Sequence, residues 1–479
     1  MKRSTSLLIF LTILLLPTLV TAQTWEKVPK VTQAQRTANL SGGEGWQMIF
    51  GIQYATTNTN TAYFITDTNQ VWKTTNANGT ETTWNRKANG FLANGGISLA
   101  VDPTNENIVY VAGSDNTAQS VESLIPVEGI FRTTDGGDNW ALVTSFSYAV
   151  QATQAHFHRS ARGGRHIEFA GTDIYAAPST GGLLRSADGI TWALVPKNGG
   201  GSVLDTVECR NISIHPLSIA GSATCFVSAT NGFWRVRYNN GSATVTQIGT
   251  GLGSNVFQTA FGSNTPNTMY VANGASGVYR STNGGVTFSA RNNGLSSPLA
   301  AGGKVKYLVM SPGDENNLMI TFLENPAGRN LYYTNDAGAN WTQASSMDEQ
   351  NADGWVCGST FTNLDQSYTR GTDDAQAPIA FHPTNKDVAL VSGWGAQVKK
   401  TTDGGVTWKY SNSGYIGSAQ GHYGTTHIGW DSTNSNRATF FHGDFGPMIT
   451  TDGESTFKSI VTTWNNRVAA DSGAMRGNI

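Results

Sequence analysis

Short segments in which apolar and polar residues alternate recur along most of the chain, separated by turn-rich stretches. Alternation with a period of two is typical of strands that bury one face. The segments begin roughly 45–50 residues apart, except for two intervals of about 70, so we expect each to open a repeated unit. The eight segments are Trp46–Tyr54, Ile97–Val101, His166–Phe169, Cys209–Ile214, Val256–Phe261, Val305–Met310, Pro378–Phe381 and Thr426–Trp430. Units of this length are typical of propeller blades, so the sequence predicts an all-β fold, a β-propeller of seven or eight four-stranded blades.

A turn of the form Ser/Thr-x-Asp-x-Gly-x-Thr-Trp recurs in phase with these segments. The Asp carboxylate can accept backbone N–H bonds, the Gly permits a positive φ, and the aromatic residue can pack between sheets. These aspartates are therefore expected to be structural. Clear copies are Thr133–Trp140, Ser186–Trp192 and Thr401–Trp408; looser copies are Asn283–Phe288, Asp336–Trp341 and Asp452–Phe457; a degenerate copy is Asn76–Trp84, and the motif is lost near Asn231–Trp234.

The repeated turn resembles the Asp-box (BNR) repeat of sialidases, sortilin-type domains and several glycosidases. The resemblance implies a propeller in which Asp-box turns join the third strand of each blade to the fourth.

Residues 1–22 are predicted to be a signal peptide. Met1-Lys2-Arg3 is positive, Leu7–Leu16 is apolar, and Val20-Thr21-Ala22 supplies small residues before a cleavage site. We therefore expect a secreted, extracellular protein. The apolar run is shorter than the ~20 residues of a membrane span, so no membrane insertion is expected. The net charge is −2 and no basic run occurs, which disfavours nucleic acid as a partner.

The three cysteines, Cys209, Cys225 and Cys357, lack the spacing of a metal site, and neither a metal nor a cofactor is expected. Cys209 and Cys225 fall in one repeat and could bridge neighbouring strands, since an exported protein permits disulfides. Cys357 would then be left as a free thiol.

Two domain organisations fit the repeats. In the first, residues 23–479 form a single propeller, and Trp25–Lys30, which echoes Trp192–Lys197, supplies an outermost strand that closes the ring. In the second, seven blades extend to about residue 435 and the start of a second, truncated propeller follows.

The loops opposite the repeated turns are the expected site face, because loops on a rigid scaffold carry function. Asp67 and Asp444 lie there, in the first and last units, which a ring of eight blades would make neighbours. The longest loop on this face, Met347–Gln376, combines acidic residues with aromatic ones, including Trp355 and Tyr368. Carboxylates beside exposed aromatic rings suit carbohydrate, although a solvated polar loop has the same composition.

Three stretches also resemble the N-terminal propeller of glycoside hydrolase family 74 (GH74), the xyloglucanases. They are Gly42–Trp46 with Ala62–Asp67, Ser98–Asn105, and Gly163–Phe169 leading to Gly182–Ser186. The resemblance implies two seven-bladed propellers with a cleft between them, and a catalytic Asp in the first blade of each. Asp67 and Asp444 match those positions, but Thr68-Asn69-Gln70 and Pro447 depart from the Gly-Gly turns of the family.

The leading hypothesis is therefore a secreted glycoside hydrolase-like propeller that acts on a β-glucan or xyloglucan by an inverting mechanism. Asp67 and Asp444 would be the general acid and general base, in an order the sequence does not assign. The polysaccharide or glycan would contact a set of ring-bearing residues: Trp46, Trp355, Tyr368, Trp394, His422 and Tyr423. The alternative is a non-catalytic Asp-box propeller that binds carbohydrate or protein.

A sialidase is disfavoured, because Arg159, Arg162 and Arg165 lie in one loop and not on separate blades. Together with His156, His158 and His166, they form a cluster that could bind an anion or a metal, although such loops are more often solvated.

Overall fold

The computed structural model describes residues 49–459 apart from a set of loops. The described part omits residues 67–70, 80–83, 88, 92, 94, 115–128, 146–164, 179–181, 196–203, 205–206, 208, 250–251, 253–255, 263, 313, 324–330, 345, 348–377, 393–397, 411–427, 431–432, 435–437, 443–445 and 451–457.

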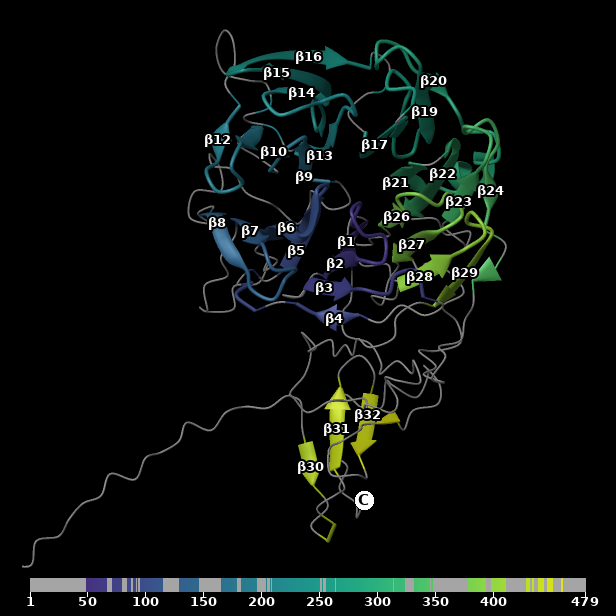
Figure 1. The fold of residues 1–479 in the computed structure, drawn as a ribbon. Helices are drawn as coiled ribbons and strands as arrows, with labels where there is room; N and C mark the ends of the chain where they lie inside the picture. Colours follow the sequence, from purple (N-terminus) through teal and green to yellow (C-terminus); the bar gives the residue numbers. More distant parts are fainter. Residues whose placement is uncertain are drawn as a thin grey trace, which may run out of the picture.

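In this described part, seven antiparallel four-stranded meanders are arranged as a ring around a central axis (Figure 1). The first four blades are β1 (Ile49–Tyr54), β2 (Ala62–Thr66), β3 (Val71–Thr74), β4 (Asn85–Arg86); β5 (Gly95–Asp102), β6 (Asn105–Ser114), β7 (Gly129–Thr133), β8 (Ala141–Ser145); β9 (Ile167–Ala170), β10 (Asp173–Ala176), β11 (Leu184–Ser186), β12 (Ala193–Leu194); and β13 (Cys209–Ile214), β14 (Ser222–Ala229), β15 (Gly232–Asn239), β16 (Ser242–Ile248).

The other three blades follow in the same order. They are β17 (Gln258–Phe261), β18 (Met269–Ala272), β19 (Val278–Ser281), β20 (Ser289–Ala290); β21 (Lys304–Ser311), β22 (Asp314–Leu323), β23 (Leu331–Thr334), β24 (Thr342–Gln343); and β26 (Ile379–Phe381), β27 (Ala389–Ser392), β28 (Val398–Thr401), β29 (Thr407–Tyr410). A short helix, α2 (Ser296–Ala300), joins β20 to β21. The predicted all-β propeller is confirmed.

The ring closes after seven blades. Each innermost strand contacts the next one, and β26 of the seventh blade contacts β1 of the first. One hydrophobic cluster spans this junction, joining Ile52 and Trp84 of blade 1 to Leu390 and Val398 of blade 7. The expectation that Asp67 and Asp444 belong to neighbouring blades of one ring is therefore wrong, because that inference needed an eighth blade between the seventh and the first.

The eighth repeat forms a separate four-stranded sheet. It comprises β30 (Ile428–Trp430), β31 (Ala438–His442), β32 (Gly446–Thr450) and β33 (Lys458–Ser459), and it lies outside the ring (Figure 1). The sequence pattern that predicted a further blade was therefore right about the local strand order and did not reveal which strands close the ring.

The outer edge of blade 7 is paired by β25 (Ser346–Met347), which runs parallel to β29. The segment expected to close a blade from the N-terminus, Trp25–Lys30, lies outside the described residues. β25 protects part of an edge that would otherwise offer unpaired backbone groups.

The repeated turns join the third and fourth strands as expected, and their Asp or Asn side chains organise them. Asp135 Oδ1 accepts the N–H of Asn139 at 2.9 Å, and the Thr133 hydroxyl donates to the same carboxylate at 2.8 Å. Asn283 takes the equivalent role in blade 5, accepting the N–H of Thr287 at 3.0 Å. Hydrogen bonds from the Asn139 side chain and backbone lower the pKa of Asp135 to about 2. We call these five turns, centred on Asp135, Asp188, Asn283, Asp336 and Asp403, the Asp turns.

Asp turns also fasten neighbouring blades to one another. The indole N–H of Trp140, in blade 2, donates to the Lys87 carbonyl of blade 1 at 2.8 Å, and Trp341 repeats the contact with Arg291. The turn of blade 3 approaches blade 2 so closely that a Cβ at Gly189 would lie 1.8 Å from the Tyr110 hydroxyl oxygen. Gly189, with φ of 72°, is therefore required both for the turn and for the contact between blades.

Blade 4 lacks an Asp turn. Its third and fourth strands are joined by a tight hairpin at Asn240-Gly241, where both residues have positive φ, as a type I′ turn requires. Asn231 therefore lies one turn earlier, between the second and third strands, and not in a decayed copy of the motif.

The strand register excludes a bridge between Cys209 and Cys225, and both side chains are buried. Cys209 pairs with Ala229, and Cys225 pairs with Ile214 at the other end of the same ladder. Four residues of strand separate Cys225 from Ala229, which is about 13 Å at 3.3 Å per residue and well beyond the reach of a disulfide.

A first prediction concerns acid stability. The folded-state pKa of Asp135 lies below its ordinary value of 3.8, so its contribution is present above about pH 4 and is lost as the pH falls towards 2. Asp135→Asn should flatten the fall of unfolding free energy with acid while keeping the turn, because Asn283 shows that Asn forms the same bonds. Asn283→Asp should make the unfolding free energy fall more steeply with acid. Urea unfolding from pH 2 to 6 measures both slopes, and unchanged slopes in both variants would contradict this role.

A second prediction concerns ring closure. The Lys400 ammonium of blade 7 donates to the carbonyl oxygens of Ala77 and Gly79 in blade 1, at 2.6 and 2.7 Å, although Lys400 is only 6% exposed. Lys400→Met leaves these two carbonyls without that donor and should lower the unfolding free energy by about 1–3 kcal/mol. The exposed Lys386→Met is the matched control and should change it by less than about 0.5 kcal/mol. Equal effects in a urea titration would argue against a closing role for Lys400.

Candidate functional site

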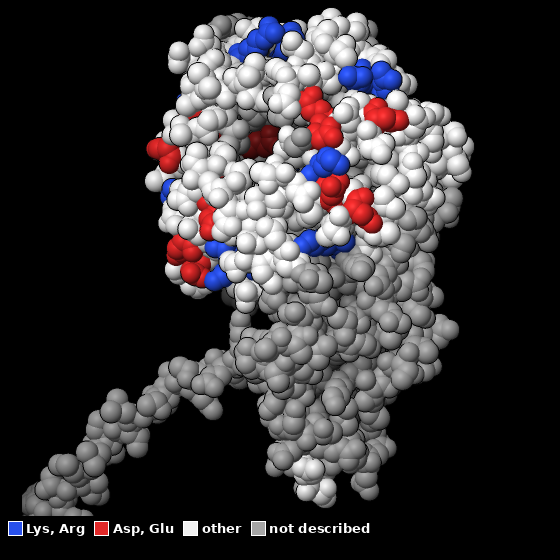
Figure 2. Space-filling model, turned by 45° about the vertical axis from the view of Figure 1, so that its right-hand side comes forward, with Lys and Arg blue, Asp and Glu red and all other residues white. Residues whose placement is uncertain are grey.

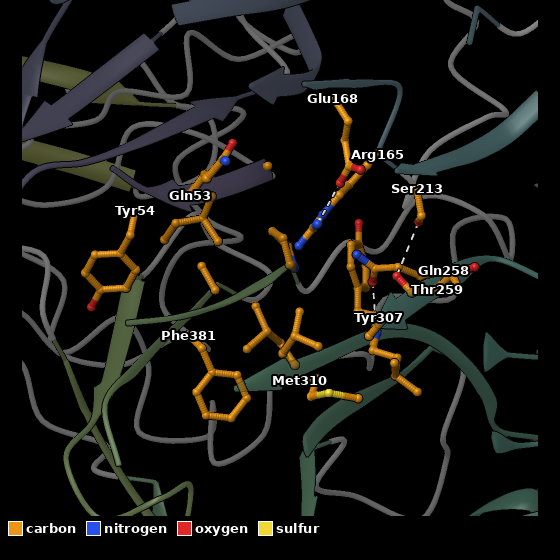
Figure 3. Close-up of a pocket in the computed structure, with 18 of the residues that line it drawn as sticks. Gln53, Tyr54, Arg165, Glu168, Ser213, Gln258, Thr259, Tyr307, Met310 and Phe381 are labelled. Carbon is orange, nitrogen blue, oxygen red and sulfur yellow. Dashed lines mark hydrogen bonds and ion pairs between the residues drawn. The ribbon is translucent and has the colours of Figure 1, made fainter. Parts of the chain in front are cut away.

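The seven innermost strands surround a central cavity of about 340 Å³ (Figure 3). Every blade contributes to its lining, because the inner strands run along the axis of the ring. The cavity reaches the surface as a hollow in the middle of the ring, with acidic atoms in its depth (Figure 2). Glu168 is the acidic residue among the lining side chains.

Polar side chains in this cavity bind the free edges of neighbouring inner strands. An innermost strand has no partner on its axial side, so its N–H groups there need other acceptors. Gln53 Oε1 accepts the N–H of Val101 at 3.2 Å, joining blades 1 and 2. Glu168 Oε2 accepts the N–H of Ile214 at 2.8 Å, joining blades 3 and 4.

The same arrangement occurs between blades 5 and 6, where Gln258 Oε1 accepts the N–H of Leu308 at 2.8 Å. The hydroxyl of Ser213 donates to the carbonyl of Thr259 at 3.3 Å and so links blades 4 and 5 (Figure 3). These polar residues of the inner strands thus join neighbouring blades and also line the cavity.

One charged pair lies in the cavity. Arg165 Nη1 donates to Glu168 Oε1 at 2.7 Å (Figure 3). The Arg165 side chain is 49% exposed and the Glu168 side chain 18%, so the guanidinium reaches the open space while the carboxylate is held below it. The pair makes the polar part of the cavity neutral overall.

Arg165 and His166 are the described members of the basic cluster noted in the sequence. His166 is fully buried, its Nδ1 lies 2.8 Å from the Ala177 carbonyl, and its N–H donates to the Ser98 hydroxyl. His166 is therefore a structural residue, and the described residues contain no group of three or more potential metal ligands. The other members, His156, His158, Arg159 and Arg162, lie outside the described part.

The wall contributed by blades 6 and 7 is apolar. Phe381 and Met310 lie in it, together with the buried Tyr307 (Figure 3). Burial raises the pKa of the Tyr307 hydroxyl. Blades 1 to 5 contribute the polar groups. The cavity is thus divided into a polar and an apolar side.

Comparisons with known proteins find similarity in structure but not in sequence. No family model matches the chain, and no curated protein matches it. A GH74 xyloglucanase from Xanthomonas campestris matches with a TM-score of 0.60 and 14% identity, over 88% of this chain and 68% of that one. A GH74 enzyme from Niastella koreensis matches with a TM-score of 0.59 and 17% identity, over 88% and 67%. An ancestral GH74 enzyme matches with a TM-score of 0.52 and 18% identity, over 88% and 55%.

The chain shares its propeller fold with GH74 enzymes. At these identities the likeness concerns the fold alone, and it does not carry over any catalytic residue. Within the described residues, no helix has the length and apolar character needed to cross a membrane.

All eight residues predicted to act on a glycan lie outside the described part: Asp67, Asp444, Trp46, Trp355, Tyr368, Trp394, His422 and Tyr423. Their places in the chain are nevertheless defined by the strands around them. Asp67 follows β2 and precedes β3, and Asp444 follows β31 and precedes β32. In the sequence, each Asp therefore falls between the second and third strands of a four-stranded sheet.

The sequence did not single out Gln53, Glu168 or Gln258 as cavity residues. A usable signal was present: each is a large polar residue in the first strand of a blade, within a segment that is otherwise mostly apolar.

A third prediction tests the bond between Glu168 and the next blade. Glu168→Ala removes the acceptor of the Ile214 N–H and should lower the unfolding free energy by about 1–3 kcal/mol. Glu168→Gln keeps an oxygen acceptor and should cost less than half as much. Amide hydrogen exchange should accelerate at Ile214 in the Ala variant but not in the Gln variant. Equal protection in both variants would contradict the assignment.

Proposed function

We propose that this chain is a secreted, glycoside hydrolase-like propeller that acts on a β-glucan or xyloglucan by an inverting mechanism. The observation that supports the proposal is that Asp67 and Asp444 each fall, in the sequence, between the second and third strands of two separate four-stranded sheets. The ring is closed without β30–β33, so this sheet is available as the first blade of a second unit. The GH74 resemblance implies this arrangement, with a catalytic Asp in the first blade on either side of a cleft.

In this proposal Asp67 and Asp444 divide the roles of general acid and general base. An inverting reaction needs carboxyl groups about 6.5–9.5 Å apart, so that a water can attack from the face opposite the leaving group. The acid needs a raised pKa and the base an ordinary one, which depends on different environments for the two carboxyls. Trp46, Trp355, Tyr368, Trp394, His422 and Tyr423 would contact the sugar rings.

The Asp turns and residues 1–22 support two further features of the proposed protein, its Asp-box repeats and its export. The hydrogen bonds of the Asp turns support their assignment as Asp-box repeats, since carboxylate, hydroxyl and backbone N–H meet in the same way in several blades. The composition of residues 1–22 supports export by a signal peptide and an extracellular location.

A non-catalytic glycan-binding propeller is the second candidate, and a specific observation favours it. Thr68-Asn69-Gln70 follows Asp67 where the family resemblance implies a Gly-Gly turn, and Pro447 lies in β32 three residues after Asp444. A different turn would orient the carboxylate differently, which matters because general acid–base transfer needs close geometry.

The fourth prediction separates the two candidates. The chain should release reducing sugar from xyloglucan or a mixed-linkage β-glucan, and Asp67→Asn and Asp444→Asn should each reduce the rate at least about 100-fold. Asp387→Asn, at an exposed surface ion pair, is the matched control and should leave the rate unchanged.

Two results would overturn the catalytic proposal. One is binding of xyloglucan, measured by affinity electrophoresis, without release of reducing sugar; this is the result expected for a binding propeller. The other is activity that survives both substitutions, which would place the chemistry on other residues.

A further inference from the structure

The central cavity has free hydrogen-bond donors on its polar side. Gln53 and Gln258 each use the amide oxygen to accept a backbone N–H, and this bond fixes which way each amide points. Their NH₂ groups therefore remain as donors, and neither has a hydrogen-bond partner among the described residues. Arg165 adds further N–H groups, since Glu168 takes the bond from Nη1.

The charge balance selects among possible ligands. Arg165 and Glu168 neutralise one another at 2.7 Å, and the other cavity-lining residues that the structure describes are uncharged. An anionic ligand would be attracted by Arg165 but repelled by the Glu168 carboxylate. A cationic ligand would be attracted by Glu168 but repelled by Arg165. A neutral ligand rich in hydroxyl groups avoids both penalties.

The apolar wall of the cavity favours a ligand that also has an apolar face. Phe381, Met310 and Tyr307 present apolar surface from blades 6 and 7 towards the polar groups of blades 1 to 5 (Figure 3). A pyranose ring has the matching property, with C–H groups on its faces and hydroxyl groups around its edge. The volume of about 340 Å³ falls within the range of about 300–1,000 Å³ of small-molecule sites.

We propose that the central cavity of the ring is a binding site for a neutral mono- or disaccharide. This site differs from the proposed cleft of Asp67 and Asp444, since its described residues lie in the inner strands or directly beside them, whereas the two Asp residues fall between second and third strands in the sequence. The choice of a β-glucan fragment as the probe rests on the proposed function, whereas the site itself rests on the cavity.

The experiment is calorimetric titration of the full chain with cellobiose and with glucose. Ala260 lines the cavity and is only partly buried, so Ala260→Phe should occupy the space and weaken binding at least tenfold. Thr246→Val, on the exposed outer strand of blade 4, is the matched control and should bind as the unmodified chain does. Thermal unfolding of each variant verifies that it is folded.

Glu168→Gln tests the charge argument independently of the steric variant. It keeps an acceptor for Ile214 but leaves Arg165 without its counter-charge, so glucuronate should bind at least tenfold more tightly than to the unmodified chain. Cellobiose affinity should change less than threefold. A shift for glucuronate with no shift for cellobiose supports the site even if Ala260→Phe fails to fold.

The outcomes separate this proposal from the catalytic one. Cellobiose binding that survives Asp67→Asn and Asp444→Asn but is lost in Ala260→Phe supports the cavity site, whatever the hydrolytic activity. No binding of either sugar, or cellobiose binding that Ala260→Phe leaves unchanged while the Asp variants abolish it, overturns the proposal.

Discussion

Each blade of this protein is a sheet with two apolar faces, and the fold depends on covering both. The core clusters show how this is done: Ile65 of blade 1 packs with Val109 and Val111 of blade 2, and equivalent clusters join the later blades. A row of seven blades would leave one apolar face exposed at each end. Closing the row into a ring removes both exposed faces at once, which is why the contact between blades 7 and 1 matters more than any single turn.

Closure has a second consequence, at the centre of the ring. It places seven strand edges around one axis, where their N–H groups have no neighbouring strand. Gln53, Glu168 and Gln258 supply acceptors for three of these groups, so the cavity is polar on that side because the fold requires it. An amide that accepts through its oxygen still presents an NH₂ group. Residues selected for holding the blades together therefore also leave donors that can recognise a ligand.

Much of the fold followed from the sequence because it depends on local patterns. The expected segment Cys209–Ile214 coincides with β13, and the segment Val256–Phe261 contains β17. The number of blades in the ring did not follow, because β30–β33 has the same local order as a blade. Closure is decided by contacts such as that of Lys400 with Ala77, which are 323 residues apart.

The candidate site was predicted less completely, for related reasons. The possible bridge between Cys209 and Cys225 failed on strand register, which neither cysteine reveals by its position in the sequence. Gln53 and Glu168 read as the polar positions of alternating strands, and only the placement of strands from different blades around one axis makes them line a common cavity. The sequence contains the polar residues, but the distances between them are set by the ring.

The two proposed catalytic aspartates must be distinguished from the structural ones, since both kinds lie in turns. In the Asp turns, the residue two before the Asp is a Ser or Thr whose hydroxyl donates to it, as Thr133 does to Asp135. The corresponding residues are Ile65 before Asp67 and His442 before Asp444. Four residues after Asp135, Asn139 binds both carboxylate oxygens, whereas Val71 and Met448 stand at that spacing from Asp67 and Asp444. The sequence around Asp67 and Asp444 thus lacks the residue types that hold the structural carboxylates in place, and this difference supports the role proposed for both.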